Sequence, residues 1–310
     1  MGEIKGYRLS DELTTQNAGF CKWGFCTKGN HEFFIKEFLS PVYPSDSSEL
    51  SPKVIERKQR LCESFFHEKK EFYNALSQCR TGNNVVIEDF FRFGSKYYMI
   101  TDKVSSVGTD PHIISKLDNK KKEAFIRSIL YSVAAFHEAG IIHADIKPDN
   151  MLLKETRDSY YTAKIIDFDS GFFTSSVPEN VQGDFLYLSP EVFQRMNDSL
   201  VSITEKIDIF ALGILFHQYW TGTMPGIPSD YHYIFEAVMD GNTPTVSNLI
   251  PEPVHSMIQQ MLSLNPQERP SARILLYIFK KADTSTEDTP VQTQPLQKKT
   301  SGFYVPTDFD

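Results

Sequence analysis

The chain has 310 residues, of which 40% are hydrophobic and 23% are charged, and its formal net charge is −8. This length suggests about two compact units, and the composition can bury a sizeable core, which excludes a disordered or fibrous protein. The negative charge gives no reason to expect binding to a nucleic acid or to an anionic membrane.

The sequence favours neither export nor insertion into a membrane. The N-terminal residues lack the basic-then-apolar pattern of a signal peptide, and the longest apolar run, Ile207–Phe216, is interrupted by Asp208 and is too short to span a bilayer. The 4 cysteines all lie in the first part of the chain without Cys-x-x-Cys spacing. They predict reduced, buried thiols in a cytoplasmic protein, with neither a disulfide framework nor a zinc site.

The first part of the chain is predicted to consist of strands and one helix. Aromatic and β-branched residues, punctuated by Gly-Asn and Gly-Ser turns, predict four strands: Phe20–Thr27, Glu32–Phe38, Val85–Phe91 and Tyr97–Thr101. Between the second and third of these strands, a Pro- and Ser-rich stretch precedes a helix expected from about Lys53 to Leu76.

The pattern becomes helical from Asn119 onward, with helices expected over Lys122–Glu138, Ile203–Thr221 and Val254–Leu264. The change predicts an α+β protein with a small β-rich lobe over residues 7–102 and a larger helical lobe over 103–281, joined near Asp102–Gly108. Residues 282–310 are rich in Thr, Pro and Gln and lack apolar periodicity, so they are predicted to form a disordered tail.

The segment with the clearest chemistry lies between these helices. It reads Ile-His-Ala-Asp-Ile-Lys-Pro-Asp-Asn over residues 142–150 and is followed by an apolar run. A second apolar strand, Ala163–Ile166, then ends in Asp-Phe-Asp at 167–169. If this motif stood alone, a structural alternative would also explain it: a polar turn between two buried strands, with His143 as a core histidine.

The spacing of polar groups in this segment favours phosphoryl transfer. Asp145 is suited to accept the proton of an attacking hydroxyl, and Lys147 to neutralise charge on the migrating phosphoryl group. Asn150 and Asp167 offer the oxygen ligands that magnesium prefers. The sequence therefore predicts a catalytic pair, Asp145 and Lys147, beside a metal site.

Over residues 7–281 the chain resembles a eukaryotic-type serine/threonine protein kinase. Residues 142–150 are similar to the catalytic loop His-Arg-Asp-x-Lys-Pro-x-Asn, with Ala144 in place of the arginine, and Asp-Phe-Asp stands where Asp-Phe-Gly is usual. Gly183–Glu191 resembles the end of an activation segment, with Ser-Pro-Glu for Ala-Pro-Glu. Asp208 matches a buried helix aspartate that ties down the catalytic loop, and Arg269 matches the arginine that pairs with Glu191.

The resemblance implies a two-lobed kinase fold. It also implies an enzyme that uses ATP with Mg²⁺ or Mn²⁺ to phosphorylate Ser or Thr residues of a protein substrate and of itself. Lys36, in Phe-Phe-Ile-Lys, is similar to the lysine of Val-Ala-Ile-Lys that grips the phosphates. The alternative for this residue is an edge-strand lysine that keeps a strand soluble. The resemblance assigns nucleotide binding to Lys36, Glu68, Gly19, Asp102, Val104 and Leu152.

The family also requires a helix glutamate that pairs with this lysine, and two residues compete for the role. Apolar residues from Leu61 to Leu76 recur at helical spacing, and Glu68 falls within their stripe while Glu71 lies at its margin. Counting back from Val85 favours Glu71 unless the loop before it carries an insertion. Because residues 80–83 read as such an insertion, the sequence predicts Glu68.

Several positions depart from the family pattern. In the glycine-rich loop, expected over residues 14–19, only Gly19 remains, and Phe34 replaces a small residue over the adenine. Asp169 replaces a glycine that helps the segment flip, and Asp184 replaces a Ser or Thr and is expected to pair with Lys147.

These departures keep two other functions open. One is a pseudokinase, a scaffold that retains the fold and binds nucleotide weakly or not at all. The other is a small-molecule kinase of the aminoglycoside-phosphotransferase kind, which shares the His-x-Asp-x-x-x-x-Asn pattern. The complete set of phosphate- and metal-handling groups opposes the first, and the activation-segment and late-arginine motifs oppose the second.

Overall fold

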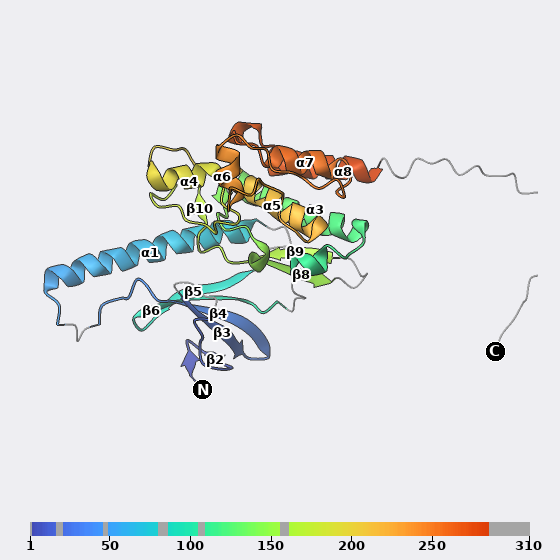
Figure 1. Ribbon diagram of the computed structural model, residues 1–310. Helices are drawn as coiled ribbons and strands as arrows, with labels where there is room; N and C mark the ends of the chain where they lie inside the picture. Colours follow the sequence, from blue (N-terminus) through green and yellow to red (C-terminus); the bar gives the residue numbers. More distant parts are fainter. Residues whose placement is uncertain are drawn as a thin grey trace, which may run out of the picture.

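The computed structural model describes residues 2–16, 21–45, 49–79, 86–104, 109–155 and 161–284. The chain forms a β-sheet lobe and a larger helical lobe, and a long helix, α1 (Pro52–Gln78), lies between them (Figure 1). This arrangement confirms the predicted α+β class and two-lobed organisation. In the part of the chain that the structure describes, no helix has both the length and the apolar character needed to cross a bilayer.

The small lobe is built on one antiparallel sheet. Within the described residues it has six strands, in the order β1-β2-β3-β4-β6-β5. Their bounds are β1 (Glu3–Ile4), β2 (Tyr7–Leu9), β3 (Cys21–Lys28), β4 (His31–Phe38), β5 (Ile87–Phe93) and β6 (Lys96–Asp102). The first two strands were not predicted, because two or three residues are too few to show a period-2 pattern. The other four agree with the predicted strands to within about two residues.

Two tight turns determine the register of this sheet. Lys28 pairs with His31 across Gly29-Asn30, and Phe93 pairs with Lys96 across Gly94-Ser95. Gly29 and Gly94 have φ values of 61° and 60°, which only glycine adopts without a steric penalty. This register places Lys36 opposite Met99 in the middle of the sheet. Lys36 is therefore an inner-strand residue, and the edge-strand alternative is wrong.

Helix α1 packs with a face that differs in part from the one predicted. Leu61, expected on the inner face, is 63% exposed, whereas Cys62 is buried. Further along the helix, the buried residues are Phe72, Tyr73 and Leu76. The buried face therefore shares Phe72 and Leu76 with the predicted stripe and is rotated from it by less than one residue, that is, by less than about 100° of helix.

The large lobe surrounds a helix that is buried almost along its whole length. Helix α5 (Lys206–Thr221) carries apolar residues on all sides and ends at Gly222, whose φ is 81°. It packs against α2, α3 and α7. The lobe contains α2 (Pro111–Ile114), α3 (Asn119–Glu138), α4 (Pro190–Asn197), α6 (Ile234–Met239), α7 (Val254–Met261) and α8 (Ala272–Thr284).

Short strands and 3₁₀ turns at the lobe interface carry the chemistry-bearing motifs. They are β7 (Ile141–Ile142), η1 (Pro148–Asn150), β8 (Met151–Glu155), β9 (Tyr161–Ile165), β10 (Phe172–Phe173) and η2 (Pro266–Glu268). Strand β7 pairs with β10, and β8 pairs with β9 in a hairpin. These pairings bring the catalytic-loop motif and the Asp-Phe-Asp motif to one end of the interface.

Two further predictions concern the cysteines and the tail. All four cysteines are buried, and none forms a disulfide. Helix α8 extends to Thr284, beyond the boundary predicted at residue 281. The remainder of the predicted tail lies outside the described residues.

Candidate active site

The catalytic loop leaves β7 in a strained conformation that one buried carboxylate holds. Ala144 has a φ of 62°, a left-handed conformation that costs a non-glycine residue about 1–2 kcal/mol. The backbone N–H groups of His143 and Ala144 donate to the two carboxylate oxygens of Asp208, each at 2.9 Å. Asp208 is 1% exposed on α5. The predicted role of Asp208 in tying down the loop is confirmed.

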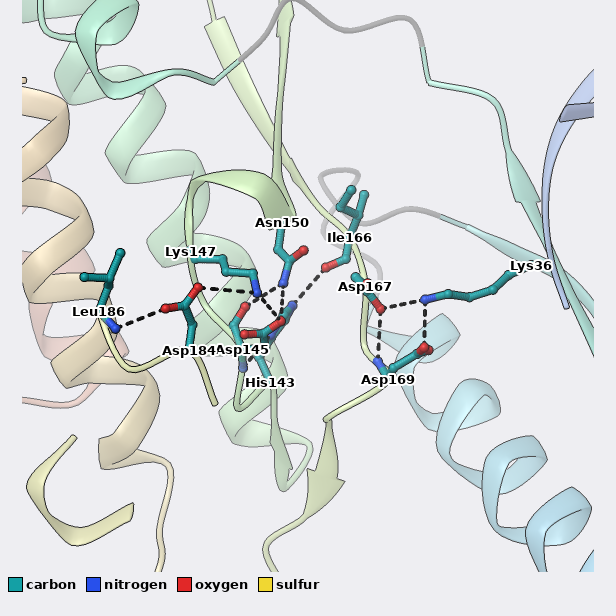
Figure 2. Close-up of polar contacts among 10 residues, drawn as sticks. All are labelled: Lys36, His143, Asp145, Lys147, Asn150, Ile166, Asp167, Asp169, Asp184 and Leu186. Atoms are coloured by element: carbon teal, nitrogen blue, oxygen red, sulfur yellow. Dashed lines mark hydrogen bonds and ion pairs between the residues drawn. The ribbon is translucent and has the colours of Figure 1, made fainter. Parts of the chain in front are cut away.

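His143 connects this loop to the Asp-Phe-Asp segment. Its Nε2 lies 3.0 Å from the carbonyl oxygen of Ile166, and its Nδ1 lies 3.3 Å from the backbone N–H of Asp145 (Figure 2). The imidazole ring also packs against Phe168, with 4.6 Å between ring centroids. His143 is fully buried, so its function is to hold the two motifs in register rather than to contact a substrate.

Asp145 stands in a small network of polar groups at the mouth of the interface. Asn150 Nδ2 donates to the carbonyl oxygen of Asp145 at 2.7 Å and to Asp145 Oδ2 at 2.8 Å. Lys147 Nζ lies 3.1 Å from Asp145 Oδ2 and 3.8 Å from Asp184 Oδ2. The expected pairing of Asp184 with Lys147 is therefore present. Figure 2 shows Lys147 between the two carboxylates.

Lys36 and Asp167 form a second polar group, opposite the first. Lys36 Nζ lies 2.8 Å from Asp167 Oδ1 and 2.7 Å from Asp169 Oδ2. Burial lowers the pKa of Lys36, but the charges of Asp169 and Asp167 outweigh it, so the pKa lies above its usual value. Burial raises the pKa of Asp167, and the charge and hydrogen bond of Lys36 lower it by more. Lys36 is thus a permanent cation that faces the interface.

The structure does not bring Glu68 to Lys36, contrary to the prediction. Glu68 is exposed, and its carboxylate accepts a hydrogen bond of 2.6 Å from Ser64 on the preceding turn. Glu71, the competing residue, is exposed as well. The physical reason is the rotation of α1 described above, which turns both glutamates away from the buried face.

A cavity between the sheet and the β8–β9 hairpin connects to these groups. It has a volume of about 290 Å³ and is lined mainly by apolar side chains, with Lys36 and Asp167 at its polar end. Asp102, Val104 and Leu152, which the resemblance assigned to nucleotide binding, also line it. An apolar slot with cationic and anionic groups at one end suits a flat heterocycle that carries phosphates.

Two other sequence predictions concern this cavity. Phe34 lines it beside Phe25 and Thr101, and its ring stacks on Trp23 with centroids 5.8 Å apart. The bulk of Phe34 therefore faces the cavity rather than being turned away. Gly19 lies outside the described residues.

The site residues fit a magnesium ion shared with a phosphate ligand. Ile166 N donates to the carbonyl oxygen of Asn150 at 3.0 Å, which places Asn150 and Asp167 at the same end of the β8–β9 hairpin. Because Asn150 Nδ2 is directed at Asp145, its amide oxygen points the other way (Figure 2). Magnesium commonly takes one or two protein oxygens and obtains the rest from phosphates and water.

Sequence reasoning missed the contacts of two residues, Asp169 with Lys36 and Lys69 with Asp169. Asp169 was considered only as the replacement of a flexible glycine, but its carboxylate is an ion-pair partner of Lys36. Lys69 was not considered, although its Nζ donates to the carbonyl oxygen of Asp169 at 3.0 Å. The available signal was the joint appearance of a carboxylate after Asp-Phe and a lysine next to Glu68.

Comparison with known families gives an independent match. The family model described as "Protein kinase domain" matches residues 45–277 of the chain. The match includes the catalytic loop, the Asp-Phe-Asp segment and most of the helical lobe; it begins after Lys36 and ends within α8.

The relatives that are similar to this chain in sequence are also named as kinases. Sperm motility kinase Z of Mus musculus is 31% identical over 161 residues, which cover 51% of this chain and 30% of that protein. The calcium/calmodulin-dependent protein kinase type II of Caenorhabditis briggsae is 26% identical over 264 residues, 80% of this chain and 48% of that protein. The corresponding alpha chain of Drosophila melanogaster is 25% identical over 272 residues, with the same 80% and 48% shares. The chain thus spans half or less of the length of these relatives.

Proposed function

The chain belongs to the protein kinase family, and we propose that it is an active, ATP-dependent serine/threonine protein kinase. The observation that carries the proposal is the convergence of Asp145, Lys147 and Asn150 with Lys36 and Asp167 at one end of the cavity. A degenerate site would be expected to lose at least one of these five groups.

In the proposed reaction, the hydroxyl oxygen of a Ser or Thr side chain attacks the γ-phosphorus of ATP. A new P–O bond forms, the bond between the γ-phosphorus and the bridging oxygen breaks, and ADP leaves with that electron pair. Asp145 accepts the hydroxyl proton, and Lys147 stabilises negative charge on the transferring group. Asn150 and Asp167 would hold Mg²⁺ or Mn²⁺, which neutralises phosphate charge when bound, and Lys36 contacts the α- and β-phosphates.

A second function, that of a nucleotide-poor scaffold, is favoured by two specific contacts. Phe34 occupies part of the cavity that an adenine would enter. Asp184, 3.8 Å from Lys147, competes with a phosphoryl group for that cation. Both contacts would weaken nucleotide binding or phosphoryl transfer without removing a reactive group. We therefore expect an activity lower than that of a kinase without these contacts, but not zero.

The test is phosphate transfer from γ-labelled ATP by the full chain in Mg²⁺ or Mn²⁺. Matched peptides with Ser, Thr, Tyr or Ala at the acceptor position would identify the hydroxyl used. We expect transfer to Ser and Thr, and at least a hundredfold lower kcat for Lys36→Met, Asp145→Asn and Asp167→Ala.

Asp149→Asn is the matched control, because Asp149 is an exposed carboxylate on the same loop as Asp145. Its kcat is expected to stay within threefold of the wild-type value. Circular dichroism and thermal unfolding would establish that each variant is folded. A folded wild-type chain that transfers no phosphate, or an Asp145→Asn form with kcat within tenfold of wild type, would contradict the proposal.

We also propose that the enzyme acts in the cytoplasm and phosphorylates itself. Thr174, Ser175 and Ser176 are exposed between β10 and α4, close to the catalytic loop in the chain. The Thr-rich residues 284–301 are tethered to the same lobe, which gives them a high effective concentration at the site. Peptide mapping after incubation with ATP and Mg²⁺ is expected to find phosphate in one or both segments, and none in the Asp145→Asn form.

A further inference from the structure

The surroundings of Lys36 differ from those the sequence predicted. Lys36 is 5% exposed, so its charge has to be balanced by groups of the protein itself. Its Nζ contacts two carboxylates that come from one short segment, Asp167 at 2.8 Å and Asp169 at 2.7 Å.

The helix that faces this pair presents a cation where a carboxylate was expected. Lys69 is half-buried and donates from Nζ to the carbonyl oxygen of Asp169 at 3.0 Å. It precedes the buried Tyr73 by one helical turn, so it lies on the inner face of α1. Burial lowers the pKa of Lys69, and the nearby charge of Lys36 lowers it further, while Asp169 raises it. Two lysines thus converge on one aspartate.

Asp167 has two proposed roles, as a partner of Lys36 and as a ligand of a divalent cation. A divalent cation held by Asp167 would share its carboxylate and would reduce the attraction of Asp167 for Lys36. Among the described residues, Asp169 is then the carboxylate left in ion-pair contact with Lys36.

We propose that Asp169 is the positioning residue of Lys36, in the role for which the sequence predicted a helix glutamate, and that Lys69 in turn holds the Asp169 backbone. The helix therefore supplies a cation, Lys69, and the Asp-Phe-Asp segment supplies the carboxylate that contacts Lys36. This inference rests on the proposed function, because Lys36 needs a fixed position only if it binds the phosphates of a nucleotide.

The first measurement separates positioning from general stability. In Asp169→Asn the side chain keeps its shape and loses its charge. We expect KM for ATP to rise at least fivefold, while KM for the peptide changes less than twofold. Glu68→Gln and Glu71→Gln are the matched controls. Each removes one carboxylate charge at an exposed position of α1, the helix that carries Lys69. Each control is expected to keep KM for ATP within twofold of wild type.

The second measurement is a rescue. Asp169→Gly removes the carboxylate, and Lys69→Glu then returns a carboxylate to the inner face of α1. We expect the double variant Lys69→Glu/Asp169→Gly to recover at least half of the lost kcat/KM for ATP. Lys69→Met/Asp169→Gly removes the same cation without adding an anion and is expected to recover none. A residue that only supported the fold would show the same defect in both double variants.

Isothermal titration with MgADP keeps the two proposals distinguishable. A wild-type chain that binds MgADP and transfers no phosphate would refute the proposed function, and the same variants would then test the inference through Kd, with the same fivefold expectation. Absence of nucleotide binding by the wild-type chain would refute both. Increased activity or unchanged affinity in Asp169→Asn would overturn the inference, because Asp169 would then restrain Lys36 from the nucleotide or not position it.

Discussion

At the scale of single residues, the site combines strained backbone with tightly held side chains. Asp167 has a φ of 58° and Ala144 a φ of 62°, and no glycine stands at either position. Such conformations persist where surrounding contacts over-determine them, and they cluster at functional sites. Here the contacts are the ion pair of Asp167 with Lys36 and the hydrogen bonds from the catalytic-loop backbone to Asp208. The strain lies at the two segments that carry the proposed chemistry.

Phe34 allows a prediction about nucleotide affinity. Its ring lines the cavity and stacks on Trp23, so Phe34→Ala enlarges the cavity and removes an aromatic contact. We expect KM for ATP to fall severalfold and the free energy of unfolding to decrease by about 1–3 kcal/mol. Steady-state kinetics and denaturant unfolding measure the two effects. A higher KM would mean that the ring forms a surface on which the adenine packs.

At the scale of secondary-structure elements, buried polar contacts anchor the site to the large lobe. Arg269, which follows η2, is 1% exposed and makes a two-pronged ion pair with Glu191 of α4 at 2.6 and 2.9 Å. The predicted pairing of these residues is confirmed. Asp208 anchors the catalytic loop to α5, and His137 of α3 lies 2.9 Å from its carboxylate. One buried carboxylate thus joins α4 to the residue after η2, and the other joins α5 to α3 and to the catalytic loop.

Asp208→Asn is expected to lower the free energy of unfolding by about 2–4 kcal/mol, because it removes the charge that accepts these bonds. Burial raises the pKa of Asp208, but the hydrogen bond and charge of His137, with the N–H of His143, bring it below the ordinary value. A carboxyl whose pKa is lowered by folding stabilises the protein above its unfolded pKa, and this contribution is lost as the pH falls toward the folded pKa.

The measurement is denaturant unfolding of wild type and Asp208→Asn across pH. The difference between them is expected to keep its full size down to about pH 5 and to shrink below about pH 4. Asp230→Asn, at an exposed position of the same lobe, serves as the control and is expected to change stability by less than about 0.5 kcal/mol. A difference that grows on acidification would contradict the assigned pKa.

At the scale of the whole molecule, the two lobes meet across α1 and the Asp-Phe-Asp segment. Lys36 belongs to the sheet, Lys69 to α1 and Asp169 to the large lobe, so their contacts join all three parts. Figure 2 shows the contact between Lys36 and Asp169. The catalytic loop itself is held by Asp208, within the large lobe. Ala144 replaces the arginine that many family members pair with a phosphorylated loop. The loop therefore needs no phosphate to balance a buried charge.

This leads to a prediction about regulation. Changing Thr174, Ser175 and Ser176 together to Ala is expected to leave the initial rate within tenfold of wild type, as is treatment of the wild-type chain with a phosphatase. Initial rates against one peptide substrate measure both. A larger loss, equivalent to more than about 1.4 kcal/mol of transition-state stabilisation, would show that phosphorylation of this segment switches the enzyme.

The sequence by itself determined the residues of the proposed catalytic machinery and the class of the fold. Asp145, Lys147 and Asn150 lie within six consecutive residues, and Asp167 follows one hairpin later, so local chain geometry is enough to bring them together. The four longer strands of the sheet were likewise predicted from local sequence, that is, from apolar patterning and glycine turns. Short elements such as β1 and α6 were missed because they contain too few residues to show a period.

Only the tertiary structure decided which residues of α1 face Lys36. A helix turns by about 100° per residue, so a rotation by part of this angle is enough to replace the inward side chain of one turn with its neighbour. That rotation turns Glu68 outward and brings Lys69 to Asp169. Apolar spacing cannot resolve the rotation of α1, because aromatic residues at several adjacent positions are compatible with both the predicted and the observed inner face. The choice depends on how Phe72, Tyr73 and Leu76 pack beneath the sheet, and that packing involves residues distant in the sequence.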